Sequence, residues 1–268
     1  MNTMFINEID RKFAETKKNG RAAIMPFLTM GYPEKELSLS LLETLSANGA
    51  DIIEVGIPYS DPLADGPVIQ HSSQLALDNG ITPDQVFDIL SAYNEKKNSA
   101  ILVIMTYYNI LLQNGLENFA IQCKKANVSG VVVPDLPLEE CAQLKKILNN
   151  NKIHFIHFIP PNISEERIKL IASQATGFIY LISVTGVTGK RKQMDPNLEI
   201  IAKSIRKYTR TPIALGFGIS NAKQVAQASK NVDGVIIGSA LIEEIKQPSC
   251  AIERASKFMR AVSDYSAT

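Results

Sequence analysis

The sequence predicts an α/β protein, a single (β/α)8 barrel of the TIM type that spans residues 1–268 and carries extra N- and C-terminal helices. Three observations support this prediction. Short runs rich in β-branched residues recur eight times along the 268 residues. Segments with helical periodicity lie between these runs, and such alternation is typical of a parallel sheet. No Gly-x-Gly-x-x-Gly motif follows the first run, so the open doubly wound sheet is only the second choice.

The expected strands follow one another at residues 23–29, 51–55, 101–106, 130–133, 153–158, 178–183, 212–215 and 234–237. A longer insertion separates the second strand from the third. One helix of this insertion should begin at Thr82-Pro83-Asp84-Gln85, where threonine caps the helix, proline takes the first helical position and glutamine completes a capping box. Asp195-Pro196 repeats the pattern of a cap followed by proline. About 20 residues at the N-terminus and about 25 at the C-terminus remain for the extra helices.

Composition narrows the class of protein. The chain is 45% hydrophobic and 21% charged, with a net charge of +1, as expected for a soluble globular protein. It has no basic stripe for nucleic acid, no apolar run long enough for a membrane span and no signal peptide. Cys123, Cys141 and Cys250 are odd in number and far apart, which indicates free thiols in a reducing compartment. We therefore expect a cytoplasmic protein, with the plastid stroma as the alternative.

Glu54 is the strongest catalytic candidate. With a period of two, Ile52, Glu54 and Gly56 share one face of the second strand, and Ile53 and Val55 share the other. The helix-facing side favours Ile and Val, so Glu54 should point into the barrel near its top. None of the eight strand runs contains Lys or Arg to pair with it. Burial without a cation raises the pKa of a carboxyl group, which suits a proton donor and acceptor near neutral pH.

Three further carboxylates lie in loops after strands. Asp65 lies in the Pro- and Gly-rich loop after the second strand, and catalysis and a simple turn explain it equally well. Asp61 follows a Ser-Asp-Pro turn signal and is better explained as a turn residue. Asp135, after the fourth strand, is a third candidate that serves equally well as a cap of the following helix. If Asp65 joins Glu54, the pair can divide acid and base roles on one small substrate.

Glycine-bearing loops end the last three strands and predict a phosphate site. They are Thr-Gly-Val-Thr-Gly at 185–189, Gly-Phe-Gly-Ile-Ser at 216–220 and Gly-Ser at 238–239. Glycine lets backbone N–H groups approach an anion, and barrel enzymes often bind phosphate after strands seven and eight. Tight barrel turns are the alternative explanation. Residues 184–194 read either as a mobile lid or as a solvated loop.

The sequence lacks the residue patterns that metal-dependent and covalent catalysis need. The three histidines, His71, His154 and His157, form no metal-binding pattern, and no strand lysine is present for a Schiff base. No Gly-x-Ser-x-Gly elbow or Cys/His pair is evident. Acid–base chemistry by carboxylates on a phosphorylated substrate, without a metal or cofactor, remains.

The segment from Ile53 to Gly66 resembles the signature of the tryptophan synthase alpha chain family, and the resemblance extends over nearly the whole chain. It implies the retro-aldol cleavage of indole-3-glycerol phosphate into indole and glyceraldehyde 3-phosphate. It implies Glu54 as general acid and base, and Asp65 as the group that holds the indole N–H. The other residues that it implies for substrate binding are Phe27, Tyr107 and Tyr180 around the indole, Thr188 closing over Asp65, and Phe217, with Gly189, Gly218, Gly238 and Ser239 at the phosphate.

The resemblance also implies a partner, the pyridoxal-phosphate-dependent β chain, in an α2β2 complex, with the cofactor in the partner alone. The contact surface would be the loop at 58–67 and the region of Pro137. Two alternatives stay open at this point. One is a phosphosugar isomerase or epimerase on the same barrel, and the other is a non-catalytic subunit that activates a partner.

Overall fold

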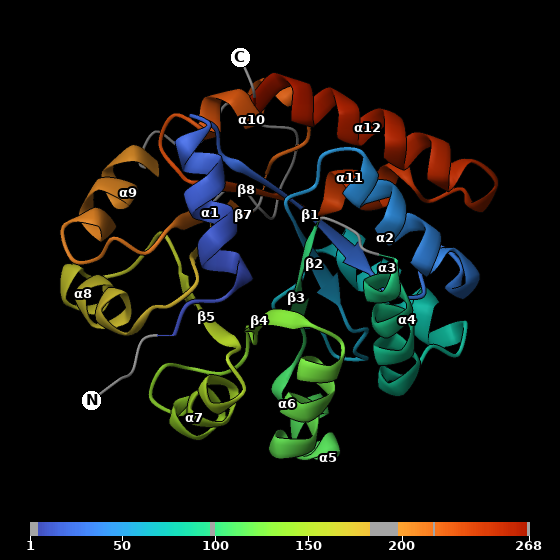
Figure 1. Ribbon diagram of the computed structural model, residues 1–268, viewed down its shortest axis with the longest axis horizontal. Coiled ribbons are helices and arrows are strands. Elements are labelled where there is room, and N and C mark those ends of the chain that lie inside the picture. Colours follow the sequence, from blue (N-terminus) through green and yellow to red (C-terminus); the bar gives the residue numbers. More distant parts are fainter. Residues whose placement is uncertain (1–4, 97–99, 183–197, 217, 267–268) are drawn as a thin grey trace.

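The computed structural model describes residues 5–96, 100–182, 198–216 and 218–266. Eight parallel strands form a closed barrel in the order β1 to β8, and β8 pairs with β1 to close it. Figure 1 shows helices surrounding these strands. The strands are β1 Ala23–Thr29, β2 Ile52–Gly56, β3 Ile101–Met105, β4 Val128–Val132, β5 His154–Ile159, β6 Ile179–Ile182, β7 Ile213–Gly216 and β8 Gly234–Ile237. The predicted (β/α)8 barrel is therefore confirmed, with strand ends within two residues of the expected ones.

Twelve α-helices and two short 3-10 helices, η1 Lys35–Leu37 and η2 Pro248–Cys250, lie in the described part of the chain. The insertion between β2 and β3 holds two α-helices, and the second begins at the predicted capping box of Thr82 and Gln85. Asp195-Pro196 lies outside the described residues. The α-helices are α1 Glu8–Lys18, α2 Ser38–Ala47, α3 Pro67–Asp78, α4 Pro83–Glu95, α5 Tyr108–Asn114, α6 Leu116–Lys125, α7 Ala142–Asn150, α8 Glu165–Gln174, α9 Leu198–Arg206, α10 Ala222–Ala228, α11 Ser239–Glu244 and α12 Ala251–Ser266.

The two predicted terminal helices are present and have different roles. Helix α1 packs Ile9 and Phe13 into the same core cluster as the inward side chains of the barrel. Phe13 contacts the ring of Phe178 at 5.8 Å between centroids, and Asp10 lies 2.7 Å from His154 Nε2 on β5. These contacts hold α1 against the barrel interior at the start of the strands. Helix α12 instead lies outside the barrel along α10 and α2 (Figure 1).

The barrel has two apolar layers, as the period of two predicts for its strands. On β2, Ile52 belongs to the inner cluster, while Ile53 and Val55 belong to the larger cluster between strands and helices. Glu54 shares the inward face with Ile52 and lies beside Phe27 of β1 and Val103 of β3 in the strand register. The predicted inward orientation of Glu54 is therefore the observed one.

None of the helices in the described ranges combines the length and apolar character that a bilayer span requires.

Candidate active site

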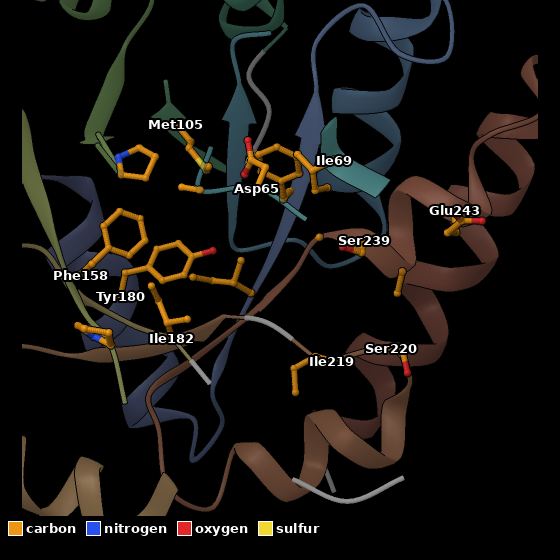
Figure 2. Close-up of a pocket in the computed structure, with 18 residues that line it drawn as sticks. Asp65, Ile69, Met105, Phe158, Tyr180, Ile182, Ile219, Ser220, Ser239 and Glu243 are labelled. Carbon is orange, nitrogen blue, oxygen red and sulfur yellow. The ribbon is translucent and has the colours of Figure 1, made fainter. Parts of the chain in front are cut away.

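A cavity of about 540 Å³ lies at the carboxyl ends of the strands. Figure 2 shows Phe158 and Tyr180 on one side of this cavity and Ser220 and Ser239 on the other, with Asp65 near Met105 and Ile69. In barrel enzymes the chemistry is found at this end, because the loops after the strands meet there. The predicted residues that line the cavity are Phe27, Asp65, Tyr180, Gly218, Gly238 and Ser239.

Glu54 is 2% exposed and does not itself line the cavity. Tyr180, which does, donates its hydroxyl to Glu54 Oε2 at 3.5 Å. The other oxygen, Oε1, has no hydrogen-bond partner among the described residues. Burial and, to a smaller extent, the charge of Asp65 together raise the pKa of Glu54 to about 8, although the hydrogen bond from Tyr180 opposes them. Glu54 is therefore largely protonated at neutral pH, as a proton donor must be.

Asp65 has a different environment. Burial raises its pKa, the hydrogen bond from the Tyr107 hydroxyl, 3.0 Å from Oδ2, opposes that rise, and the resulting pKa is about 6. At neutral pH Asp65 is therefore mainly an anion while Glu54 is mainly neutral. This separation of two nearby carboxyl groups is the electrostatic property that assigns one of them to acid work and the other to charge stabilisation.

Tyr107 has a role that the sequence did not indicate. It does not line the cavity, and its ring stacks on Tyr59 with centroids 5.0 Å apart. Its hydroxyl accepts a hydrogen bond from the Ala64 N–H at 3.1 Å and donates to Asp65. Tyr107 thus holds the loop that carries Asp65, in addition to any contact with a substrate.

Two glycines make room for the aromatic wall. A Cβ on Gly56, which shares the inward face with Glu54, would lie 2.5 Å from Cζ of Phe27. A Cβ on Gly216 of β7 would lie 2.3 Å from Cε1 of Tyr180. Real Cβ contacts are not this short, so both inward positions must stay without a side chain for the two rings to take their places.

The wall of the cavity also includes residues that the sequence did not indicate. Phe158 contacts the ring of Tyr180 at 4.7 Å and lies beside it in the strand register. Met105, Ile182 and Ile236 are inward positions near the ends of β3, β6 and β8. They could have been found by applying to each of these strands the period of two that was applied to β2. Positions in loops and helices carry no such signal; they include Ile69, Pro134 and Glu243.

The opposite side of the cavity is built from the loops after β7 and β8. Gly218 has φ +80, a left-handed conformation that favours glycine, and Ser220 lies close behind it. Gly238 precedes α11, whose first turn contains Ser239 and Ala240. The N–H groups of a first helical turn have no acceptor within the helix and can bind an anion. Thr188, Gly189 and Phe217, and the predicted loop at 184–194, lie outside the described residues.

The remaining loop carboxylates act locally. Asp61 accepts a hydrogen bond from the Ser60 hydroxyl at 2.6 Å. Asp135 does cap a helix, but not the following one. Its oxygens accept from the backbone N–H of Tyr108 at 2.9 and 3.2 Å, at the start of α5, which precedes Asp135 in the chain. The expected cap was wrong about the helix because loops of neighbouring barrel units meet at this rim.

Within the described ranges, no three His, Cys, Asp or Glu side chains lie close enough together to hold a metal ion. His154 pairs with Asp10 of α1, and His157 is buried on the opposite face of β5, where burial and the charge of Lys145 lower its pKa to about 4.

Comparison with known proteins shows the family of this chain. A family model described as tryptophan synthase alpha chain matches residues 13–266. The tryptophan synthase alpha chain of Prochlorococcus marinus (strain NATL2A) is 44% identical over 255 residues, which cover 94% of each chain. That of Chloroflexus aggregans is 41% identical over 257 residues, covering 95% of this chain and 96% of the relative.

Solved structures that resemble this chain belong to tryptophan synthases as well. Tryptophan synthase of Mycobacterium tuberculosis superposes with a TM-score of 0.90 at 29% identity, covering 98% of this chain and 100% of that one. Subunit alpha from Legionella pneumophila reaches 0.89 at 30% identity, covering 97% and 98%. These relatives do not favour a phosphosugar isomerase. The matches in sequence and structure extend over nearly the whole length, and the chain belongs to the tryptophan synthase alpha chain family.

Proposed function

We propose that Glu54 and Asp65 carry out the reaction of this family, the lyase cleavage of indole-3-glycerol phosphate into indole and glyceraldehyde 3-phosphate. The observation that supports these roles is the placement of the two carboxyl groups: Asp65 lines the cavity beside the Tyr107 hydroxyl, and Glu54 is buried behind Tyr180, which also lines the cavity. In these places the pKa of Glu54 is raised to about 8 and that of Asp65 to about 6. At neutral pH this pair offers one proton donor and one anion. Both are required when a neutral ring must be protonated while positive charge develops on its nitrogen.

The proton balance follows from these roles. Protonated Glu54 gives its proton to the indole ring carbon that carries the glycerol chain, and the positive charge that appears on the ring nitrogen is stabilised by Asp65. Glu54, now a carboxylate, takes the proton of the adjacent glycerol hydroxyl. The carbon–carbon bond then breaks, its electron pair restores the aromatic ring, and the hydroxyl carbon becomes the aldehyde. Glu54 ends protonated, so no external acid, base or redox partner is consumed.

Substrate orientation follows from the two ends of the cavity. Phe27, Phe158 and Tyr180 form an apolar side suited to the indole ring. Gly218, Gly238 and Ser239 form the side suited to phosphate, through backbone N–H groups at the start of α11. Thr188, Gly189 and Phe217 keep their predicted roles in substrate binding as part of this proposal.

The partner and location are also proposals. We infer a β chain that carries pyridoxal phosphate, in an α2β2 complex, with no cofactor in this chain. The loop at 58–67 supports a contact surface because Leu63 is 91% exposed there. A cytoplasmic location and the assignment of residues 1–268 to one catalytic domain remain predictions.

The test is indole release from indole-3-glycerol phosphate, measured with and without a β chain and with a chelator. Glu54→Gln and Asp65→Asn should each abolish release while the far-UV circular dichroism stays that of the folded protein. Glu117→Gln, which changes an exposed carboxylate on α6, is the matched control and should keep full activity. Full turnover in either site variant would refute the proposed roles. If the isolated wild-type chain released no indole under any condition, a non-catalytic activating subunit would be the better interpretation.

A further inference from the structure

Asp135 is a loop carboxylate that the proposed reaction does not use. It follows β4, is not part of the cavity wall, and directs both oxygens at one backbone group. The N–H of Tyr108 lies 2.9 Å from Oδ1 and 3.2 Å from Oδ2. A backbone donor held in this way fixes the position of the chain around it, because its bond geometry allows little rotation.

The residue next to this donor is Tyr107, which precedes α5 and is 4% exposed. Its hydroxyl donates to Asp65 Oδ2 at 3.0 Å and accepts from the Ala64 N–H at 3.1 Å. The loops after β2, β3 and β4 are therefore joined in series by two hydrogen-bonded contacts. One joins residues that are 42 apart in sequence, and the other joins residues that are 27 apart. The series ends at Asp65.

We propose that Asp135 is a positioning residue for Asp65, acting through the backbone of Tyr108 and the hydroxyl of Tyr107. This inference rests on the proposed function, because it assigns importance to the orientation and ionisation of Asp65. Asp135 fixes where the phenol of Tyr107 stands, and the phenol orients Asp65 toward the cavity and stabilises its anion. Without Asp135, the start of α5 loses its cap and the phenol loses its fixed distance to Asp65.

A purely local role is the competing explanation, in which Asp135 only stabilises the short helix α5. The two explanations differ in what happens to the ionisation of Asp65. The titratable groups that face Asp65 within the described ranges are Tyr107, Glu54 and Tyr180. Of these, Tyr107 lowers the pKa of Asp65 by hydrogen bonding. A displaced Tyr107 therefore raises that pKa, whereas a weakened helix alone does not.

The experiment measures kcat/KM for indole release against pH in the full chain with its β partner. We expect Asp135→Ala and Tyr107→Phe each to lower kcat/KM roughly tenfold, the effect of one hydrogen bond to a charged group. Each should also move the acidic limb of the profile upward by about one pH unit. Asp135→Asn removes the charge but keeps an oxygen acceptor for Tyr108, so it should retain a profile close to wild type.

The decisive measurement is the double variant. If Asp135 acts through Tyr107, then Asp135→Ala adds nothing to Tyr107→Phe, and the double variant equals Tyr107→Phe alone. Effects that multiply, or an unchanged acidic limb in Asp135→Ala, would overturn the inference. Asp135→Leu, which also lacks an acceptor for the Tyr108 N–H, should show the same shift and serves if the alanine variant does not fold. Glu54→Gln is assayed in parallel: if it retains activity the proposed function fails, whereas an inactive Glu54→Gln beside an unaltered Asp135→Ala refutes only the positioning role.

Discussion

The burial of Glu54 should make the stability of this protein depend on pH in a way that one substitution removes. The pKa of Glu54 rises from its ordinary value of 4.5 to about 8 in the folded chain. Between these two pH values the unfolded chain loses this proton while the folded chain keeps it, so stability falls as pH rises. The contribution of the protonated side chain is fully present below pH 4.5 and is lost as pH rises through 8.

The magnitude follows from the shift. A difference of 3.5 pH units, 8 minus 4.5, at about 1.4 kcal/mol per unit gives about 5 kcal/mol. This is a large part of the roughly 5–15 kcal/mol that stabilises a typical domain. Glu54→Gln keeps the size of the side chain and cannot ionise. The variant should therefore gain stability relative to wild type by up to about 5 kcal/mol between acidic and alkaline pH.

Urea unfolding of wild type and Glu54→Gln at several pH values from 5 to 9 provides the assay, with free energies from linear extrapolation. All other titrating groups are shared, so the difference between the two curves isolates Glu54. Asp65→Asn should narrow the effect, because the charge of Asp65 is the second cause of the raised pKa. Glu117→Gln should run parallel to wild type. A constant difference between wild type and Glu54→Gln over this range would show that Glu54 is not buried as a neutral acid.

Three further outcomes follow from the site and the barrel. The kcat/KM of indole release should rise through pH 6 as Asp65 ionises and fall through pH 8 as Glu54 does, and a flat pH–rate profile would contradict the assigned roles. Gly216→Ala should lower activity roughly tenfold or more, because its Cβ would displace the Tyr180 ring, 2.3 Å away; a crystal structure of the variant with the ring in place would refute this reason. Phe13→Ala should reduce the free energy of unfolding by about 3–5 kcal/mol with kcat unchanged in the folded fraction, since α1 lies at the opposite end of the strands; calorimetry and kinetics on one sample test both.

The sequence was sufficient to predict the barrel and the inward orientation of Glu54, because both depend on short repeats in the order of apolar and polar residues. Alternation along β2 decides which way Glu54 points, and the absence of strand cations decides that it lacks an ionic partner. The hydrogen bond between Tyr107 and Asp65 could not be predicted, because it joins residues 42 apart through the conformations of two loops. The same reason explains the error about Asp135, whose partner belongs to the preceding unit.

Steric roles were also hidden from the sequence. Gly56 reads as the end of a strand in the one-dimensional pattern, and only the barrel shows that Phe27 occupies the space where its side chain would be. The roles of α1 and α12 differ for a similar reason. Both are amphipathic segments of ordinary composition, and the position of each depends on which barrel surface remains uncovered.

The different depths of Glu54 and Asp65 explain why the site has two carboxylates rather than one. Glu54 lies on a strand, where surrounding side chains are apolar and the bond from Tyr180 is long, at 3.5 Å, so its charged form is poorly stabilised. Asp65 lies in a loop, where a hydroxyl at 3.0 Å stabilises its anion. Without this burial Glu54 would titrate near its ordinary value of 4.5 and would be an anion at neutral pH. Protonation of the ring carbon would then have no donor at neutral pH, so the depth of each group, rather than its chemical type, determines its role in the reaction.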